Sequence, residues 1–117
     1  MTIAQYINTA VDNEFKGEYC REAAKCYLYK DLRNLTNQQV AYARSCSPTS
    51  VAAKISFVTL VLSKKEVNKN FHERFMKIQK ACEKYATDRV NQRYTERVTR
   101  CVKIARKELL ERLNSHN

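Results

Sequence analysis

The chain has 117 residues, of which 44% are hydrophobic, so it can bury one core and is not disordered throughout. One glycine and one proline argue against a sheet, because turns are built largely from these residues. Residues 1–50 carry six basic and five acidic side chains, whereas residues 51–117 carry sixteen and seven. The basic half predicts an anionic partner, most commonly nucleic acid, with acidic proteins and membrane surfaces as alternatives.

The first predicted helix begins at a capping box. Thr2 and Gln5 have the residue types and spacing in which side chains satisfy free backbone amides at a helix start. Apolar residues then recur at helical spacing as far as Phe15. Gly17 is expected to stop this helix in a left-handed conformation, which glycine adopts freely.

Two further helices are predicted before the first clear loop. One runs from Tyr19 to a break near Asn34, and the other is short and reaches about Arg44. Thr36 and Gln39 fit a second capping box between them. The first third of the chain therefore predicts three helices.

A fourth helix is predicted after the loop of residues 45–50. Ser47 can cap this helix, and Pro48 suits its first position. The segment from Val51 to Leu62 is apolar nearly all round, which is typical of a central, buried helix. It is too short to span a membrane, which takes about 20 residues.

The remainder of the chain is predicted to be helical as well. Ser63 and Glu66 fit a third capping box, and residues 64–113 contain no glycine or proline. One helix of this length would measure about 75 Å, which is too long for a compact monomer of this size. A bend near Thr87 and Asp88 is therefore expected, since Asp88 can cap a new helix. The alternative is one unbroken helix that pairs with a second chain.

These elements predict an all-α fold, a compact four- to five-helix bundle with a long C-terminal helical segment that is kinked or straight. Residues 1–113 are expected to form a single helical domain, and residues 114–117 a frayed tail. The start of the chain lacks the basic and apolar regions of a secretory signal. An intracellular site, cytoplasmic or nuclear, is the default expectation.

The five cysteines are expected to be reduced. Their number is odd, and no two are spaced as Cys-x-x-Cys. Cys26, Cys82 and Cys101 fall on apolar helix faces, which predicts buried thiols that pack as small apolar groups. A zinc site with His72 or His116 is disfavoured, because close-spaced ligand pairs are missing.

Residues 64–113 divide into apolar and basic sides when they are plotted at 100° per residue. The apolar sides consist of Phe71, Phe75, Ile78 and Cys82, followed by Val90, Tyr94, Val98, Cys101, Ala105 and Leu109. Cations lie opposite them, with no acid directly among those of the second group. These candidate nucleic-acid-binding residues are Lys69, Lys77, Lys80, Lys84, Arg89, Arg93, Arg97, Arg100, Lys103 and Lys107.

The leading functional hypothesis is sequence-independent binding of nucleic acid, with RNA favoured and double-stranded RNA included. Lines of arginine and lysine neutralise phosphates without reading bases. The alternative is an interaction adaptor, or a homodimeric helical module, that docks an acidic partner. The third interpretation is a purely structural helical module with a solvated surface of mixed charge, since Glu73 and Glu96 have cations at pairing distance along the helix.

Catalysis is not predicted. The chain has two histidines and one glycine, so it offers neither a triad-like arrangement nor a glycine-rich phosphate loop. Glu14, Glu18 and Glu22 share a helical spacing but have no histidine partner. The sequence therefore predicts no cofactor and no metal. Among the tyrosines, Tyr29 and Tyr42 are candidates for exposed rings that stack on bases.

Overall fold

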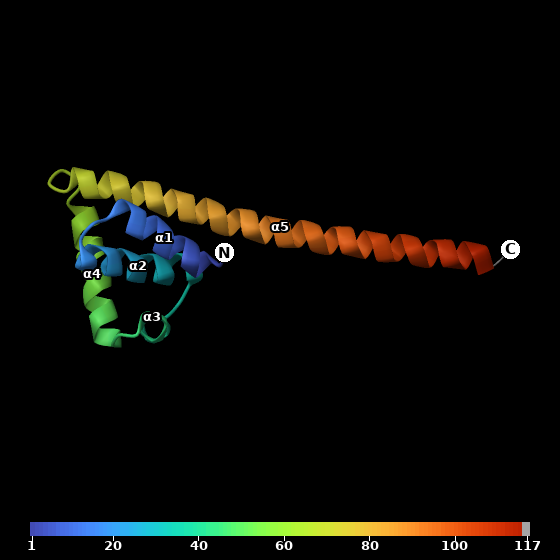
Figure 1. Cartoon of the computed structure of the whole chain (residues 1–117), viewed down its shortest axis with the longest axis horizontal. Helices are drawn as coiled ribbons and strands as arrows, with labels where there is room; N and C mark the ends of the chain where they lie inside the picture. The colour runs from blue at the N-terminus through green and yellow to red at the C-terminus, as the bar shows by residue number, and fades with distance from the viewer. Residues whose placement is uncertain (116–117) are drawn as a thin grey trace. The chain divides into compact units, whose positions relative to one another are not determined.

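The helices follow the order expected from the sequence. The computed structural model describes residues 1–115, in which five helices and no strand are found (Figure 1). The helices are α1 (Ile3–Glu14), α2 (Glu18–Arg33), α3 (Asn37–Arg44), α4 (Pro48–Ser63) and α5 (Lys69–Ser115). The all-α class predicted from the sequence is confirmed for the described residues.

Three helix starts are formed by the predicted caps. The Gln5 amide donates to Thr2 Oγ1 at 3.2 Å, and the Thr2 amide donates to Gln5 Oε1 at 2.8 Å. Thr36 and Gln39 repeat this capping box at α3. Ser47 caps α4, whose first residue is the single proline. These starts depend on residues three positions apart, so the sequence alone locates them.

Two predicted boundaries are wrong. Gly17 has a φ of −78° and is the N-cap of α2, while α1 ends at Phe15 in an extended conformation. The left-handed C-caps are Asn34 and Ser45 instead, with φ values of 52° and 55°. Ser63 is the last residue of α4, and its hydroxyl donates to a carbonyl of the same helix at 2.7 Å. A side chain that bonds backward in this way does not cap a following helix.

Helix α2, rather than α4, is the central helix of the bundle. It packs against α1, α3 and α4, and its buried residues are Ala23, Ala24, Lys25, Cys26, Leu28 and Tyr29. In α4 only Val51 and Val58 are fully buried, and Leu60 is exposed. The sequence prediction of a central α4 is therefore wrong. Small residues explain the difference, since the alanines and Cys26 of α2 let three neighbouring helices approach closely.

Aromatic rings join the beginning of α5 to this bundle. Phe75 is completely buried, and its ring meets Tyr27 edge-on with the centroids 5.3 Å apart. The Phe71 ring stacks on Phe75 at 6.0 Å. Further along α5, the Tyr85 ring stacks in parallel on the Tyr6 ring of α1, with the ring centroids 4.2 Å apart. The predicted apolar side of residues 71–82 is thus confirmed by its packing.

Helix α5 runs unbroken from Lys69 to Ser115, so the bend predicted near Thr87 and Asp88 is wrong. No glycine or proline weakens the helix there, and capping by Asp88 would sacrifice backbone hydrogen bonds of an intact helix. The helix includes two residues of the predicted tail, up to Ser115. The other two, 116 and 117, lie outside the described residues.

The chain divides into two units, Met1–Tyr85 and Ala86–Asn117. The bundle and its core belong to the first unit. In the second unit every side chain from residue 91 to residue 115 is exposed. The prediction of one compact bundle that encloses the whole chain is therefore wrong, because residues 91–115 have no buried side chain.

Within residues 1–115, no single helix has the length and apolar character needed to cross a membrane. Helices α3 and α4 meet that criterion only when taken together, and they are bent by 103° relative to each other.

Replacement of Phe75 by alanine should lower the free energy of unfolding by about 3 to 5 kcal/mol, because it leaves a cavity beneath Tyr27 and Phe71. Chemical denaturation of the two proteins measures the difference. Val67→Ala is the control, since Val67 is exposed and its truncation should change stability by less than about 0.5 kcal/mol. Equal midpoints for Phe75→Ala and the wild type would contradict the packing of α5.

Candidate nucleic-acid interface

The ten candidate cations are divided between the two units. Four lysines of α5 belong to the first unit, and all four are exposed: Lys69, Lys77, Lys80 and Lys84. They lie on the side of α5 opposite Phe75 and Ile78, which are buried. The predicted separation of lysines from apolar residues is thus confirmed in this unit.

Glu14 of α1 reduces the free charge of this lysine group. Its Oε2 lies 3.8 Å from Lys77 Nζ, and its Oε1 lies 4.0 Å from Arg74 Nε. Neither contact could be predicted from sequence patterns, because the partners are sixty or more residues apart. Lys69, Lys80 and Lys84 are left as the exposed cations of this group with no ion pair among the described residues.

Six candidate cations belong to the second unit. Arg89 is half-buried and is engaged in an interaction. The other five are exposed: Arg93, Arg97, Arg100, Lys103 and Lys107. In the part of the chain that the structure describes, none of these five forms an ion pair. Their charges are therefore available to an external anion.

One acidic residue lies among these cations, contrary to the sequence prediction. Glu96 lines a shallow hollow together with Arg100 and Lys103. Its carboxylate accepts a hydrogen bond from the Gln92 amide at 3.4 Å. A plot of side chains by helical angle gives the same result, because Glu96 falls between Lys103 and Lys107. The cationic side is thus interrupted once, near its middle.

Arg97 borders the apolar side of the second unit. At 100° per residue, its position falls only about 20° from that of Val90 and about 40° from that of Cys101. Lys103 and Lys107 lie on the far side of the helix by the same measure. The expectation that all six cations lie opposite the apolar residues is therefore wrong for Arg97, whose guanidinium flanks the apolar stripe.

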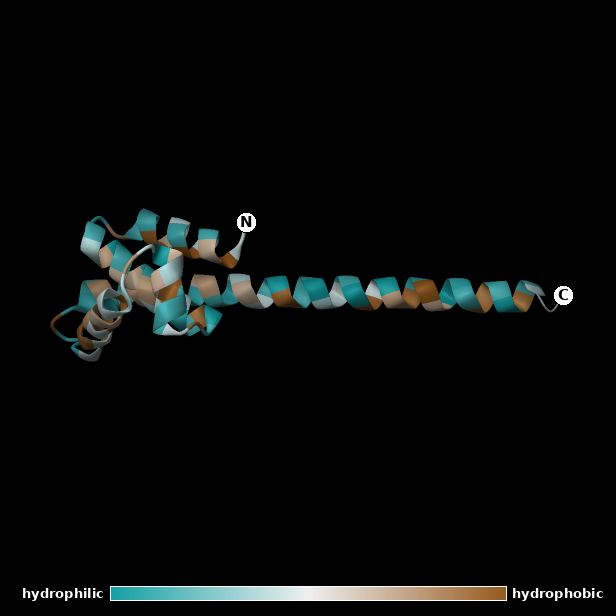
Figure 2. Cartoon of the chain, turned by 90° about the horizontal axis from the view of Figure 1, so that it is seen from below, coloured by the Kyte–Doolittle hydropathy of each residue, from teal (hydrophilic) through white to brown (hydrophobic). Residues whose placement is uncertain are grey.

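The apolar stripe of the second unit is exposed. It is formed by Val90, Tyr94, Val98, Cys101, Ala105 and Leu109. Tyr94 is 68% exposed and Leu109 is 59% exposed, whereas the sequence pattern predicted core positions. Figure 2 shows separate hydrophobic bands among hydrophilic ones along the C-terminal part of α5. Helical periodicity reports that a face is apolar but not whether another element covers it.

The five thiols differ in their surroundings. Burial raises the pKa of Cys26 to about 11 and that of Cys82 to about 11, so both are protonated at neutral pH. Cys101, predicted to be buried, is exposed. No group of three or more histidine, cysteine, aspartate or glutamate side chains is arranged as a metal site within the described residues. His116 lies outside them, and His72 is half-buried.

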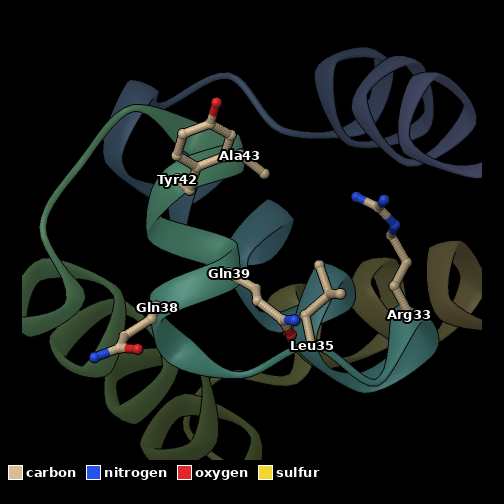
Figure 3. Close-up of a pocket in the computed structure, with 6 residues that line it drawn as sticks. All are labelled: Arg33, Leu35, Gln38, Gln39, Tyr42 and Ala43. Atoms are coloured by element: carbon tan, nitrogen blue, oxygen red, sulfur yellow. The ribbon is translucent and has the colours of Figure 1, made fainter.

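The two tyrosines proposed for stacking have different environments. Tyr42 is 92% exposed and borders an open hollow of about 400 Å³ with Arg33 and Gln39 (Figure 3). Tyr29 is buried, which contradicts the prediction that it is exposed. Its hydroxyl donates to Asn8 Oδ1 at 2.8 Å, and the Arg33 guanidinium lies 5.3 Å from its ring centroid. Only Tyr42 is left as a candidate for stacking.

A polar network in the first unit was not predicted from the sequence. Buried Lys25 places its Nζ 2.8 Å from Asp12, and Arg44 donates to both carboxylate oxygens of Glu22 through its Nε and one terminal nitrogen. Burial alone would lower the pKa of Arg44, but the hydrogen bond and charge of Glu22 outweigh it and raise that pKa. Glu22 was noted only for its spacing from Glu14 and Glu18. The network joins α1, α2 and α3, so it fixes the bundle rather than presenting charge to a ligand.

The chain matches no protein-family model, no curated protein and no solved structure. Its candidate function therefore rests on the residues and geometry described above.

Cys26 and Cys82 should react with an aromatic disulfide reagent only after unfolding, because their burial keeps them protonated and shielded. The measurement is thiol release at mildly alkaline pH with and without denaturant, followed by peptide mapping. Labelling of either residue at the rate of a small free thiol in the native protein would contradict the placement of α2 and α5.

Proposed function

We propose that this protein binds nucleic acid without regard to base sequence, with RNA favoured, through the cations of residues 86–115. The observation that carries the proposal is the set of five exposed cations without an ion pair among the described residues, from Arg93 to Lys107. A solvated surface helix normally pairs such charges with acids three or four residues away. Between Arg93 and Lys107, Glu96 is the one acid on that side of the helix, and Glu111 follows four residues after Lys107.

The spacing of these cations suits a phosphate backbone. Steps of three and four residues advance about 4.5 to 6 Å along a helix, which is comparable to the separation of successive phosphates. Arginine donates two hydrogen bonds at once to a phosphate through its planar guanidinium. Contacts of this kind fix a protein on a strand but do not distinguish bases.

RNA is favoured for a geometric reason. The wide, shallow minor groove of A-form RNA and its flanking phosphates are recognised mainly by shape. The run of cations has no glycine loop beside it, and the exposed Tyr94 ring lies on the apolar side of the helix, away from Lys103 and Lys107, so these cations offer shape and charge rather than base contacts. The exposed lysines of the first unit, Lys69, Lys80 and Lys84, form a second cationic surface of the same kind.

Reversal of charge at Lys103 and Lys107 together should weaken binding strongly for every sequence tested. Both residues lie on the far side of the helix from the apolar stripe, so their replacement by glutamate leaves that stripe intact. The slope of log affinity against log salt should fall by roughly two units, one for each lost phosphate contact. Fluorescence anisotropy with RNA and DNA duplexes of several sequences measures both quantities.

The matched control reverses Lys16 and Lys65, which are exposed and lie outside helices. This variant has the same net charge as the first, so a purely long-range effect of charge would weaken both equally. Equal losses in the two variants would contradict a defined interface. No binding of RNA or DNA by the wild type at low salt would contradict the proposed function and favour an acidic protein as partner.

A further inference from the structure

The exposed apolar stripe of the second unit has the features of a surface that pairs with itself. Its six residues recur at steps of four, four, three, four and four, which keeps them on one side of an ordinary α-helix over about five turns. A run of apolar side chains this long on one exposed face marks an interaction surface. We propose that residues 86–115 pair in antiparallel orientation with the same segment of a second copy of this chain.

The sequence of the stripe defines a register for such a pair. A twofold axis between residues 101 and 102 places Tyr94 level with Leu109 of the second copy. In the same register Val98 is level with Ala105, and Cys101 with Val102. Larger side chains thus face smaller or flexible ones along the contact, which is the arrangement that close packing requires. Because the axis is twofold, each contact occurs twice.

Charge complementarity selects the antiparallel orientation. Arg93 and Glu111 lie on the same flank of the stripe by helical angle, and the register brings them to within one residue of the same level on opposite copies. Arg97, which borders the stripe, comes to within two residues of the level of Glu108. Twofold symmetry therefore gives four ion pairs between the copies.

A parallel pair would lack these contacts. In a parallel arrangement each flank meets the opposite flank of the other helix rather than its own. The opposite flank carries Arg106 and no acid from Arg89 onward. The flanking arginines at positions 93 and 97 would then have no carboxylate to bind. Only the antiparallel orientation therefore brings Glu108 and Glu111 close to the flanking arginines of the other copy.

The proposed pairing shares Arg93 and Arg97 with the proposed interface for nucleic acid and leaves the other cations of that interface outside the contact. Lys103 and Lys107 lie away from the stripe, so pairing leaves them exposed. Binding to phosphates weakens steeply with salt, whereas contact between apolar side chains does not. Self-association at a salt concentration that releases nucleic acid therefore tests this inference by itself.

Sedimentation equilibrium of the full chain, treated with nuclease and kept reduced at high salt, should show a monomer–dimer equilibrium in the micromolar range of protein concentration. Leu109→Asp should weaken it by at least about tenfold, since one substitution places two carboxylates in the apolar contact. Leu110→Asp is the matched control. Leu109 and Leu110 are 59% and 60% exposed, but only Leu109 lies on the stripe.

Cysteine pairing tests the orientation. In a Cys101→Ser background, one preparation carries Tyr94→Cys and another carries Leu109→Cys. Oxidised glutathione accepts the two electrons and two protons of each thiol pair that closes. A disulfide between positions 94 and 109 should form when the two preparations are mixed, and neither preparation alone should cross-link at its new cysteine. Mass spectrometry of the linked peptides separates this product from any formed by Cys20 or Cys46.

Three results would overturn the inference. The first is a monomer at all concentrations, and the second is equal weakening by Leu109→Asp and Leu110→Asp. The third is cross-linking of the Tyr94→Cys preparation with itself, which would show a parallel pair. Because nucleic acid is absent, these results leave the proposed function untouched, and loss of RNA binding would leave this inference untouched.

Discussion

The structure depends on one constraint, which is that nothing in α5 stops a helix. Without glycine or proline, its backbone hydrogen bonds continue from Lys69 to Ser115, past the last residue that the bundle covers. Tyr85, stacked on Tyr6, is the last side chain of α5 within the first unit. The amphipathic pattern nevertheless continues beyond it. Residues 86–115 therefore have an apolar side and a cationic side, and every side chain from residue 91 to residue 115 is exposed.

Much of the fold could be predicted from the sequence because its signals are local. The caps at Thr2, Thr36 and Ser47 involve residues three positions apart, and the buried side of α5 at Phe75 follows from helical spacing. The packing of the helices against one another and the contacts between distant residues could not be predicted in this way. The central position of α2 depends on how closely its neighbours approach, and the network of Arg44 depends on residues more than twenty positions away.

The candidate site could be predicted only in part for the same reason. The residue types and their spacing identified the cations from Arg93 to Lys107, and all of them are exposed. The pattern could not indicate that Tyr94 and Leu109 are uncovered, because amphipathicity does not name the element that covers a face. Because these apolar residues are exposed, the same helix has two surfaces to which a partner can bind, one cationic and one apolar. We propose a polyanion as partner of the cations and a second copy as partner of the uncovered stripe, and only the first contact weakens steeply with salt.

The central claim is that residues 86–115 hold the interface for nucleic acid. Its most direct test is a titration of the isotopically labelled, full-length protein with a short RNA duplex of mixed sequence at low salt, followed residue by residue by nuclear magnetic resonance. The account predicts that amide shifts concentrate between Arg93 and Lys107 while those of Ile7 and Val40, in the core of the first unit, stay unchanged. Shifts that cluster around Tyr42 instead, or no shifts at all, would contradict it.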